Sequence, residues 1–579
     1  MSTPVSRLRP TEKRLLVGYG PAVVLGVGFL LMAILVPTIA PEQNVTAGAN
    51  AAATTGGVAT GTQGATGGST NAGGGSTNAT GGTSQGGTRA GSASAGATGG
   101  SGSATGPAAS SGPPAGTTAC SGPQVPGDPY SPACVSFSGN NGSATSRGVT
   151  GNSIIVSYRI PADNAASVDA AVQQIAGKYN STEFSDTEAD IEQTLGDLVT
   201  YFNDHFQMYG RKIVLKQFNG QGQLTEELSD GGQSEADADG LTAADTIGAF
   251  ADVSALSQPY AEALSAQHVV NIGAPYMSQP WFQQHAPYAY SFFPDCTSLG
   301  EEGGAVAVNE VVGRNVAFGG TGVTDGQPRR IAVLAPDNPV YQSCAAIVNS
   351  ALSGDHHPAT ANLTYTLDFP QLSQEAAGLE QQIVNDKITT VFCGCDPITL
   401  IYLTGDLDNA RYEPEFVNIG AAFTDEDLLA QLFDQSSWAH AAGETNNGAA
   451  PAYGTSLGYF AAKSVDPTHP PAHEVDIIYE DLYILALGIQ LAGPDLTPQN
   501  FARGLASYGG GTGEYGPWSF NVNGSGVWTP QHEFRFEWWN PNALSTFDGE
   551  KGTWVVGSSW YTTNDVPAGP MPVFPNGPQ

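Results

Sequence analysis

Basic side chains are scarce in this sequence, where 20 Lys and Arg residues stand against 54 Asp and Glu residues and the formal net charge is −34. Nucleic acid phosphates are bound by clustered Lys and Arg, so this composition argues against a nucleic acid partner. The imbalance lies beyond residue 119, where 15 basic residues accompany 52 acidic ones. Such a charge favours solubility but says little about the fold.

Charge of either sign is missing from Leu15 to Ala40, a run dominated by Leu, Val, Ala, Ile and Gly. This length spans a hydrocarbon core of about 30 Å, so we expect an uncleaved transmembrane anchor at 15–40. A cleaved secretory signal is the alternative, although Pro41 disfavours cleavage directly before it. Because the basic residues precede the run, we expect a single-pass cell-membrane protein with residues 1–14 in the cytoplasm and the bulk of the chain outside it.

Large apolar side chains are almost absent from residues 41–119, which consist mainly of Gly, Ala, Ser and Thr. Such a segment cannot bury enough surface to offset the entropy lost on ordering, so we expect a disordered linker there. A flexible chain of this length has a root-mean-square reach of roughly 50 Å. The globular part is therefore expected at 120–579.

Cysteine is also rare, with six residues in the chain. Cys120 and Cys134 bracket a short Pro-rich loop, and an exported chain meets an oxidising compartment, so we expect a disulfide between them. The pairing of the others stays open, and a zinc site is disfavoured because the Cys-x-Cys pair has only distant partners. These other cysteines are Cys296, Cys344, Cys393 and Cys395.

Beyond residue 150 the pattern alternates between apolar strands and amphipathic helices. An apolar strand at Ile331–Ala335, a turn and a helix from Val340 open a βαβ unit, and the strand and loop from Ile154 resemble it. This predicts two α/β lobes, one at about 148–294 and one at about 296–440, each with part of the C-terminal region. Ligands of such sheets bind beyond the carboxyl ends of the strands.

The remaining elements follow from the same periodicities. Strands are predicted at Ile154–Tyr158, Ile213–Phe218, Thr246–Ala251, His268–Ile272, Tyr288–Phe293, Leu363–Phe369, Thr389–Cys393 and Phe416–Ile419. Helices are predicted at Ala189–Tyr209, Ser257–Gln267, Leu299–Val312, Gln371–Asn385, Asp425–Phe433 and Glu474–Leu491. The tail from Trp518 reads as β hairpins.

Five segments resemble, in the same order, segments of type I periplasmic binding proteins, specifically the substrate-binding proteins of branched-chain amino-acid ABC importers. They are Gly148–Val156, Tyr201–Lys212, Ser257–Ile272, Asp337–Tyr341 and Gly513–Gly524. The resemblance covers about residues 148–560. It implies two Rossmann-like lobes joined by a hinge, with a small molecule bound in the central cleft.

The resemblance also implies particular cleft contacts. Ser254 matches a serine that holds the carboxylate of the ligand, and Pro275–Met277 match a loop that offers backbone groups and a Thr hydroxyl. Tyr341 matches an aromatic residue of the second lobe. Phe423 ends the loop Ala421–Phe423, where the family often supplies an acid for the ligand ammonium.

This sequence departs from the family at two of these positions. Met277 stands where a Thr is usual, although Ser278 follows it, and Phe423 brings no acid, although Asp425 and Glu426 are close. An amino acid ligand needs an anion for its ammonium and donors for its carboxylate. The ligand is therefore left open between an amino acid and a less polar molecule.

Motifs that suggest catalysis lack the context that catalysis needs. Residues 454–458 fit G-x-S-x-G, but a loop rather than an apolar strand precedes them. Residues 511–516 fit G-x-G-x-x-G without a following helix, and prolines separate His469 from His473, which argues against a metal site. We expect no enzyme, no cofactor and no metal.

The function expected from the sequence is a membrane-tethered solute-binding protein that closes on a small molecule and serves an ABC importer, with permease subunits as partners. The alternative is the ectodomain of a ligand sensor that uses the same fold without transport. A cell-wall or glycan hydrolase is a third reading with less support.

Overall fold

The computed structural model describes residues 116–163, 187–229, 231–368, 371–448, 451–452, 454–473, 475–547 and 549–578 of the chain. The expected cytoplasmic N-terminus (1–14), the transmembrane anchor (15–40) and nearly all of the expected linker (41–119) lie outside these residues. Among the residues that are described, no helix is both long and apolar enough to cross a membrane.

Two antiparallel strands open the described part of the chain, β1 (Thr117–Pro123) and β2 (Ala133–Phe137). The disulfide between Cys120 and Cys134 joins them. β1 begins inside the segment 41–119 that was predicted to be linker, so this boundary moves to residue 116. The two threonines that open β1 are β-branched and suit a strand, which a composition averaged over a long Thr-rich tract conceals.

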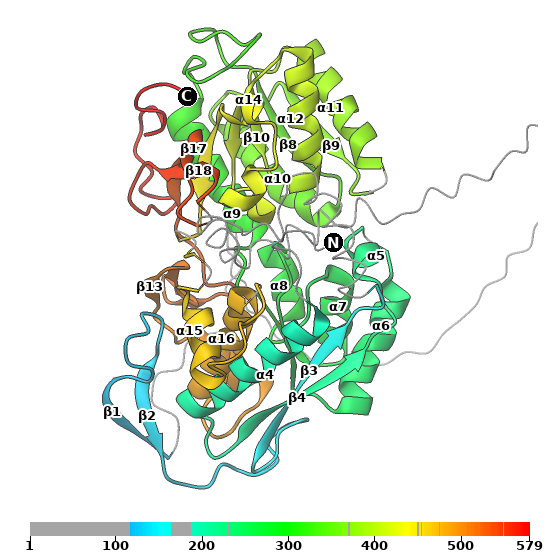
Figure 1. Ribbon diagram of the computed structural model, residues 1–579, viewed down its shortest axis with the longest axis vertical. Helices are drawn as coiled ribbons and strands as arrows, with labels where there is room; N and C mark the ends of the chain where they lie inside the picture. Colours follow the sequence, from blue (N-terminus) through cyan, green and yellow to red (C-terminus); the bar gives the residue numbers. More distant parts are fainter. Residues whose placement is uncertain are drawn as a thin grey trace, which may run out of the picture. The chain divides into compact units, whose positions relative to one another are not determined.

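The first lobe is built on a parallel sheet with the strand order β4-β3-β5-β6-β7 (Figure 1). Its strands are β3 (Ser153–Ile160), β4 (Lys212–Asn219), β5 (Ala251–Asp252), β6 (Val270–Ile272) and β7 (Ala289–Tyr290). The chain runs outward from β3 to β4 and returns past β3 to β5. This reversal creates a topological switch point between β3 and β5.

The helices of the first lobe come from two separate stretches of the chain. The first stretch supplies α4 (Glu188–His205), α5 (Leu224–Leu228), α6 (Gln233–Leu241), a π-helix (Thr242–Ile247), α7 (Gln258–Ala266) and α8 (Gln279–His285). The second supplies α15 (Leu457–Val465), α16 (Val475–Ala492) and α17 (Pro498–Leu505). α16 is almost wholly buried and lies against α4 and β6, so the late segment completes the core of this lobe (Figure 1).

Two small hairpins follow α17. They are formed by β13 (Gly511–Gly513) with β14 (Gly516–Trp518), and by β15 (Asn521–Val522) with β16 (Ser525–Gly526). Tyr130, between β1 and β2, is buried against the first hairpin, where its hydroxyl donates to the carbonyl of Gly516 at 2.8 Å. The N-terminal strands are therefore tied to a segment almost 400 residues later in the chain.

The second lobe has a sheet with the order β18-β17-β12-β11-β10-β8-β9. Its strands are β8 (Ile331–Pro336), β9 (Ala361–Tyr365), β10 (Thr390–Cys393), β11 (Glu415–Asn418), β12 (Ala441–Thr445), β17 (Arg535–Leu544) and β18 (Lys551–Val556). The five strands β8 to β12 are parallel, and their order β9-β8-β10-β11-β12 repeats the order β4-β3-β5-β6-β7 of the first lobe. β17 and β18 are added antiparallel at the β12 edge. The second switch point lies between β8 and β10.

Four helices of the second lobe, α9 (Cys296–Val306), α10 (Pro339–Gly354), α12 (Pro397–Ala410) and α14 (Gln435–Trp438), begin with a side-chain cap. The other helical elements of this lobe are a π-helix (Ala307–Val311), α11 (Leu372–Asn385), a 3₁₀ turn (Ala421–Phe423) and α13 (Asp427–Ala430). Asn338 and Asp396 cap α10 and α12, and each is followed by a proline in the first turn. An oxygen cap and an N1 proline both favour a helix start at the carboxyl end of the preceding strand.

The structure also settles the remaining cysteines of the chain. Cys296, at the start of α9, pairs with Cys344 on α10, and Cys393 at the end of β10 pairs with Cys395. Both disulfides lie in the second lobe.

One predicted strand is wrong. Thr246–Ala251 was expected to be extended, but Thr242–Ile247 form a π-helix that continues α6, and only Ala251 and Asp252 form β5. Gly248 ends the helix with a φ of 69°, a left-handed conformation that glycine adopts readily. The helix Asp425–Phe433 is likewise reduced to the single turn of α13.

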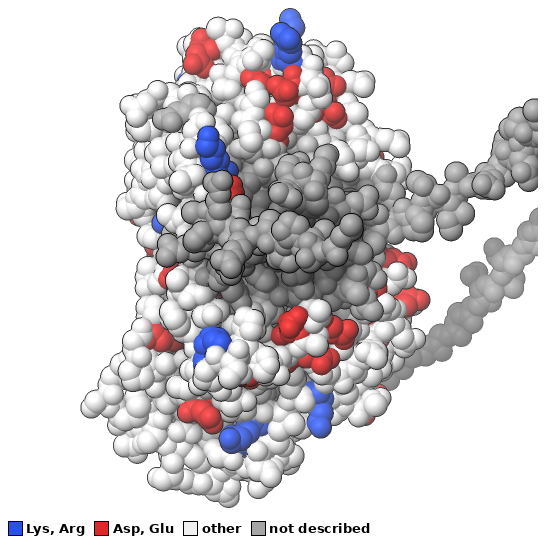
Figure 2. Space-filling view, viewed as in Figure 1, with Lys and Arg blue, Asp and Glu red and all other residues white. Residues whose placement is uncertain are grey.

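Acidic residues lie both on the surface and in the core. On the face shown in Figure 2 they gather in small groups, and basic side chains are fewer and separate. Inside the second lobe, Glu302 on α9 and Glu444 on β12 are buried, and neither oxygen of Glu444 has a hydrogen-bond partner among the described residues. Burial, with further acids nearby, raises the pKa of Glu302 to about 8. Burial and Glu302 also raise the pKa of Glu444.

These raised pKa values predict that stability falls as the pH rises from about 4.5 to about 8. The folded chain holds the protons more tightly than the unfolded chain, so the stabilisation is complete below about pH 4.5 and is lost as the pH rises through about 8. Glu444→Gln removes one buried charge without changing shape. We expect it to raise Tm by several degrees at pH 8 and by little at pH 5, measured by calorimetry, with the exposed Glu226→Gln as the control. An equal change at both pH values would contradict the assignment.

Candidate functional site

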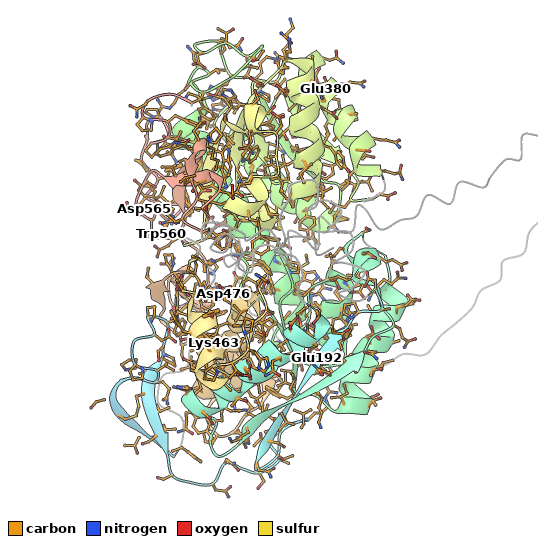
Figure 3. All side chains as sticks on the ribbon, in the orientation of Figure 1. Glu192, Glu380, Lys463, Asp476, Trp560 and Asp565 are labelled. Carbon is orange, nitrogen blue, oxygen red and sulfur yellow. A yellow bond between two sulfur atoms is a disulfide. The ribbon has the colours of Figure 1, made fainter. Side chains whose placement is uncertain are left out.

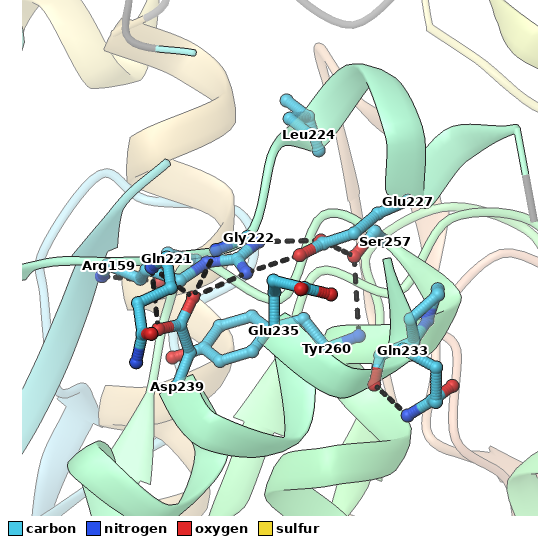
Figure 4. A network of polar contacts seen from close by, with 12 residues as sticks. Arg159, Gln221, Gly222, Leu224, Glu227, Gln233, Glu235, Asp239, Ser257 and Tyr260 are labelled. Atoms are coloured by element: carbon cyan, nitrogen blue, oxygen red, sulfur yellow. Dashed lines mark hydrogen bonds and ion pairs between the residues drawn. The ribbon is translucent and has the colours of Figure 1, made fainter. Parts of the chain in front are cut away.

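The switch point of the first lobe is filled by the protein's own side chains (Figure 4). Arg159, at the end of β3, is 2% exposed and forms a bidentate ion pair with Glu227, with N···O distances of 2.6 and 2.8 Å. Its guanidinium also lies 3.2 Å from Asp239 and 3.7 Å from the ring centre of Tyr260. A paired and hydrogen-bonded charge of this kind is held rigidly in the core.

Ser254, the predicted carboxylate contact, belongs to the same network. Its hydroxyl donates to Asp252 at 2.7 Å and accepts the backbone N–H of Arg159 at 2.8 Å. Asp252 is fully buried and also accepts from Ser157 and Tyr260, and burial raises its pKa despite these bonds. A ligand carboxylate at Ser254 would have to displace one of these internal partners, and the ligand role of Ser254 stays a prediction.

The switch point of the second lobe holds an open pocket. Its walls come from the ends of β8, β10 and β11 and from α9 and α10, and the space amounts to about 690 Å³, part of it open to solvent. We call it the apolar pocket. Its lining residues are Tyr276, Cys296, Leu299, Val333, Leu334, Ala335, Pro336, Tyr341, Cys344, Ala345, Val348, Leu367, Phe392, Gly394, Cys395, Asp396, Ile419, Ala421 and Ala422.

The few polar side chains of the apolar pocket are largely committed elsewhere. Asp396 caps α12, where one oxygen accepts the N–H groups of Ile398 and Thr399 at 2.9 Å each. Its other oxygen accepts the Tyr365 hydroxyl at 2.6 Å. The wall offered to a ligand is therefore apolar, and two disulfides contribute to it through Cys296, Cys344 and Cys395.

Tyr276 brings the first lobe to this pocket. It follows β6, is 5% exposed, and its hydroxyl accepts the backbone N–H of Phe423 in the second lobe at 3.3 Å. Tyr276, Ala422 and Phe423 all have left-handed backbones, with φ of 53°, 53° and 59°. Such conformations in residues other than glycine are costly and persist where the surrounding structure holds them, often at binding sites.

The predicted contacts divide in two groups. Tyr341 lines the apolar pocket, and Phe423 lines a second pocket that lies on the other side of Tyr276. Pro275 and Met277 are buried beside Tyr276 but line neither pocket, and Ser278 caps α8 by accepting the N–H of Trp281. The structure thus brings Tyr341 and Phe423 together around Tyr276, and leaves Ser254, Pro275, Met277 and Ser278 outside both cavities.

Some lining residues were not foreseen in the sequence. Gly394–Asp396 follow β10 and line the apolar pocket, and Tyr276 lies inside the predicted loop Pro275–Met277 without having been singled out. The pair Asp396-Pro397 directly after an apolar strand is a helix-start signal and could have located this wall. No local signal distinguishes Tyr276 from its neighbours.

The motifs that suggested catalysis have structural explanations. Ser456 caps α15 by accepting the N–H of Tyr459 at 3.0 Å, and residues 511–516 form the hairpin of β13 and β14. His469 lies on the surface with its Nδ1 2.6 Å from Asp466. In the described ranges no group of three or more His, Cys, Asp or Glu side chains is placed to hold a metal ion.

Comparison with known proteins adds a likeness of fold. No family model and no curated protein matches the chain. Its neighbours among solved structures are type I periplasmic binding proteins of branched-chain amino-acid and related ABC transporters. This likeness concerns the fold alone.

Three of these structures illustrate the range. One is a solute-binding protein of an ABC transporter from Rhodopseudomonas palustris BisB5 in complex with 3,4-dihydroxybenzoic acid (11% identity, 71% of this chain and 98% of that chain, TM-score 0.48). Another is the leucine-, isoleucine-, valine-, threonine- and alanine-binding protein from Brucella ovis (12% identity, 72% of this chain and 98% of that chain, TM-score 0.47). A third is a fatty acid ABC transporter substrate-binding protein from Thermomonospora curvata (11% identity, 74% of this chain and 97% of that chain, TM-score 0.48).

Proposed function

We propose that this chain is an extracytoplasmic solute-binding protein that binds a small, mainly apolar molecule between its two lobes and delivers it to an ABC importer. The lobes are joined where the chain passes between them after β7, after β12 and before β17, and these connections act as the hinge. Contacts from both lobes to one ligand stabilise the closed state. The anchor expected at 15–40 keeps the protein at the membrane, which N-terminal sequencing of membrane-extracted protein checks.

The observation that supports this proposal most is the apolar pocket. It lies at the switch point of an open α/β sheet, where such sheets bind ligands, and Tyr276 reaches it from the other lobe. A pocket of this size lined by apolar side chains is typical of small-molecule sites. The filled switch point of the first lobe argues against a free amino acid gripped at Ser254, because Asp252 and the Arg159 N–H already occupy that hydroxyl.

The direct test is mass spectrometry of the small molecule that copurifies with the full-length chain. Titration calorimetry then measures its affinity, beside a panel containing leucine, 3,4-dihydroxybenzoate and a medium-chain fatty acid. We expect a copurifying apolar molecule, or binding of a panel member with a rise in Tm. A preparation without bound ligand that also ignores the whole panel would count against solute binding. Loss of ligand uptake in cells lacking the chain would separate importer function from a sensor role.

Removing either tyrosine of the apolar pocket should weaken ligand binding. Tyr276→Ala and Tyr341→Ala each take away an aromatic wall, and burial of such a side chain contributes about 1.5–3 kcal/mol. We expect the affinity for the identified ligand to fall roughly ten- to a hundredfold, measured by calorimetry. Tyr402→Ala, on the exposed side of α12, is the matched control and should leave the affinity unchanged. Equal affinities in all three variants would exclude the pocket as the site.

A further inference from the structure

A second cavity lies between the lobes and has a different chemistry from the apolar pocket. It amounts to about 630 Å³, part of it open to solvent, and Tyr276 and Phe423 separate it from the apolar pocket. We call it the acidic pocket, because four carboxyl groups line it. These are Glu426, Asp476, Glu480 and Glu514. Within the described residues no Lys, Arg or His lines it.

Glu480 is the exceptional side chain of this group. It lies on α16 and is 8% exposed, and within the described part of the chain no hydrogen bond or ion pair reaches its carboxyl group. The charged groups that act on it most strongly are Asp476, Asp481, Glu514 and Glu426, all of them acids. Glu480 lines the cavity, so this pocket has an acceptor that no group in the described chain satisfies.

Two of the other three acids have hydrogen-bond partners. Asp476 accepts the hydroxyl of Tyr515 at 2.9 Å, and Glu514 accepts the backbone N–H of Leu457 at 2.6 Å. Glu426 accepts no hydrogen bond within the described residues, and burial, Asp425 and Asp427 raise its pKa against the opposing effect of Arg535. In Figure 3 Asp476 lies at the end of the first lobe that faces the second. Glu480 and Glu426 therefore carry the unsatisfied acceptors of the pocket, and Glu480 is the more deeply buried of the two.

Aromatic rings also line the acidic pocket. Phe293 lies 5.1 Å from Tyr276 and 5.2 Å from Phe423 between ring centres, and Phe292 packs on Phe293 at 3.9 Å. The faces of aromatic rings attract cations, and attract them more strongly where water is excluded. A lining of carboxylates and aromatic rings favours an organic cation over a metal ion, which would need several oxygens converging on one point.

We propose that the acidic pocket binds a protonated amine of the solute, with Glu480 accepting its N–H groups and the rings of Tyr276, Phe293 and Phe423 packing around the adjoining carbons. This inference rests on the proposed function, because it assigns a chemical class to the molecule bound in the same cleft. A protonated amine supplies charged N–H donors to Glu480. A quaternary ammonium has the charge but no N–H group, and an alcohol has a donor but no charge. The solute is then an amine with an apolar body, and the apolar pocket beside Tyr276 takes that body.

The test compares two molecules of nearly equal shape, 2-phenylethylamine and 2-phenylethanol, by titration calorimetry on the full-length chain at pH 7.5. We expect the amine to bind at least tenfold more tightly. Glu480→Gln should weaken amine binding by about ten- to a hundredfold and leave the alcohol unchanged. Asp481→Asn is the matched control, because Asp481 is the next residue on α16, is equally buried and faces Asp252 and Gly273 rather than the pocket.

A second measurement is the number of protons released when the amine binds. Burial and neighbouring acids raise the pKa values of Glu480 and Glu426, and those of Asp476 (to about 7) and Glu514 are raised as well. A bound cation requires ionised carboxylates, so amine binding should release protons, which appears as a difference in heat between phosphate and Tris buffers. Binding of the alcohol should release none.

The outcomes separate this inference from the proposed function. Equal affinities for amine and alcohol, or an unchanged amine affinity in Glu480→Gln, would refute the amine site and leave solute binding in place. Weakening by Asp481→Asn as large as that by Glu480→Gln would refute it too, because the effect would then belong to the helix and not to the pocket. If neither probe binds, the amine site is refuted, and the copurifying molecule decides the proposed function by itself.

Discussion

Arg159→Met should destabilise the first lobe more than any other single substitution considered for this chain. The variant keeps the apolar stem over Tyr260 but leaves Glu227 without its two-pronged partner in a site where both side chains are at most 1% exposed. Removing one member of a buried ion pair costs about 3–5 kcal/mol, because the remaining charge is unpaired. We expect Tm to fall by roughly 10 °C in calorimetry.

Two further variants show whether the orphaned charge is the cause. The double variant Arg159→Met/Glu227→Gln removes the unpaired charge and should recover much of the loss, since Asp239 keeps the N–H groups of Gln221 and Gly222 as donors. Lys212→Ala breaks an exposed ion pair with Asp204 at 3.6 Å and should scarcely change Tm. A double variant as unstable as Arg159→Met would show that packing, and not the ion pair, stabilises this site.

Removing the disulfide between Cys296 and Cys344 should have the second large effect. The two cysteines are 48 residues apart, and closing a loop of this length restricts the unfolded chain by about 4 kcal/mol in the chain-entropy account. We expect the double variant Cys296→Ala/Cys344→Ala to lower the free energy of unfolding of the second lobe by about that amount, measured by urea denaturation. The loop contains all of α9, β8 and the start of α10, so it ties together the elements around the apolar pocket.

The pair Cys393 and Cys395 provides the comparison within the same lobe. Only two positions separate these residues, so the same account gives their disulfide about 1.5 kcal/mol. Cys393→Ala/Cys395→Ala should therefore be the milder double variant. If both pairs proved equally costly, loop length would not be the source of the stabilisation.

Much of the fold could be predicted because its signals are local. The strand at Ile331–Ala335 and the helix that starts after Asn338 follow from an apolar run and a capping residue beside a proline, and the structure places β8 and α10 there. α4 also follows from an apolar period of 3.6 residues. The misplaced strand at Thr246–Ala251 shows the limit, since Gly248 ends a helix there and its apolar neighbours do not reveal which state precedes it.

The site was less predictable because its chemistry depends on partners that are distant in sequence. Ser254 looked like a free hydroxyl at the end of a strand, but Asp252 and the N–H of Arg159, 95 positions away, occupy it. Tyr341 and Phe423 were anticipated by resemblance, and the structure places each of them in a cavity. Tyr276 could be identified as a site residue only from the structure, where its hydroxyl accepts the backbone N–H of Phe423 from the other lobe.

The sequence by itself determined the alternation of strands and helices, the two α/β lobes and the charge balance, because apolar period, capping residues and composition act over a few residues. The tertiary structure alone decided how the other four cysteines pair, which acids are buried without donors and which switch point remains open. Those outcomes depend on how surfaces far apart in the chain meet. Glu480 illustrates this, because its neighbours Glu426 and Glu514 come from other parts of the chain, and only their convergence makes the pocket acidic.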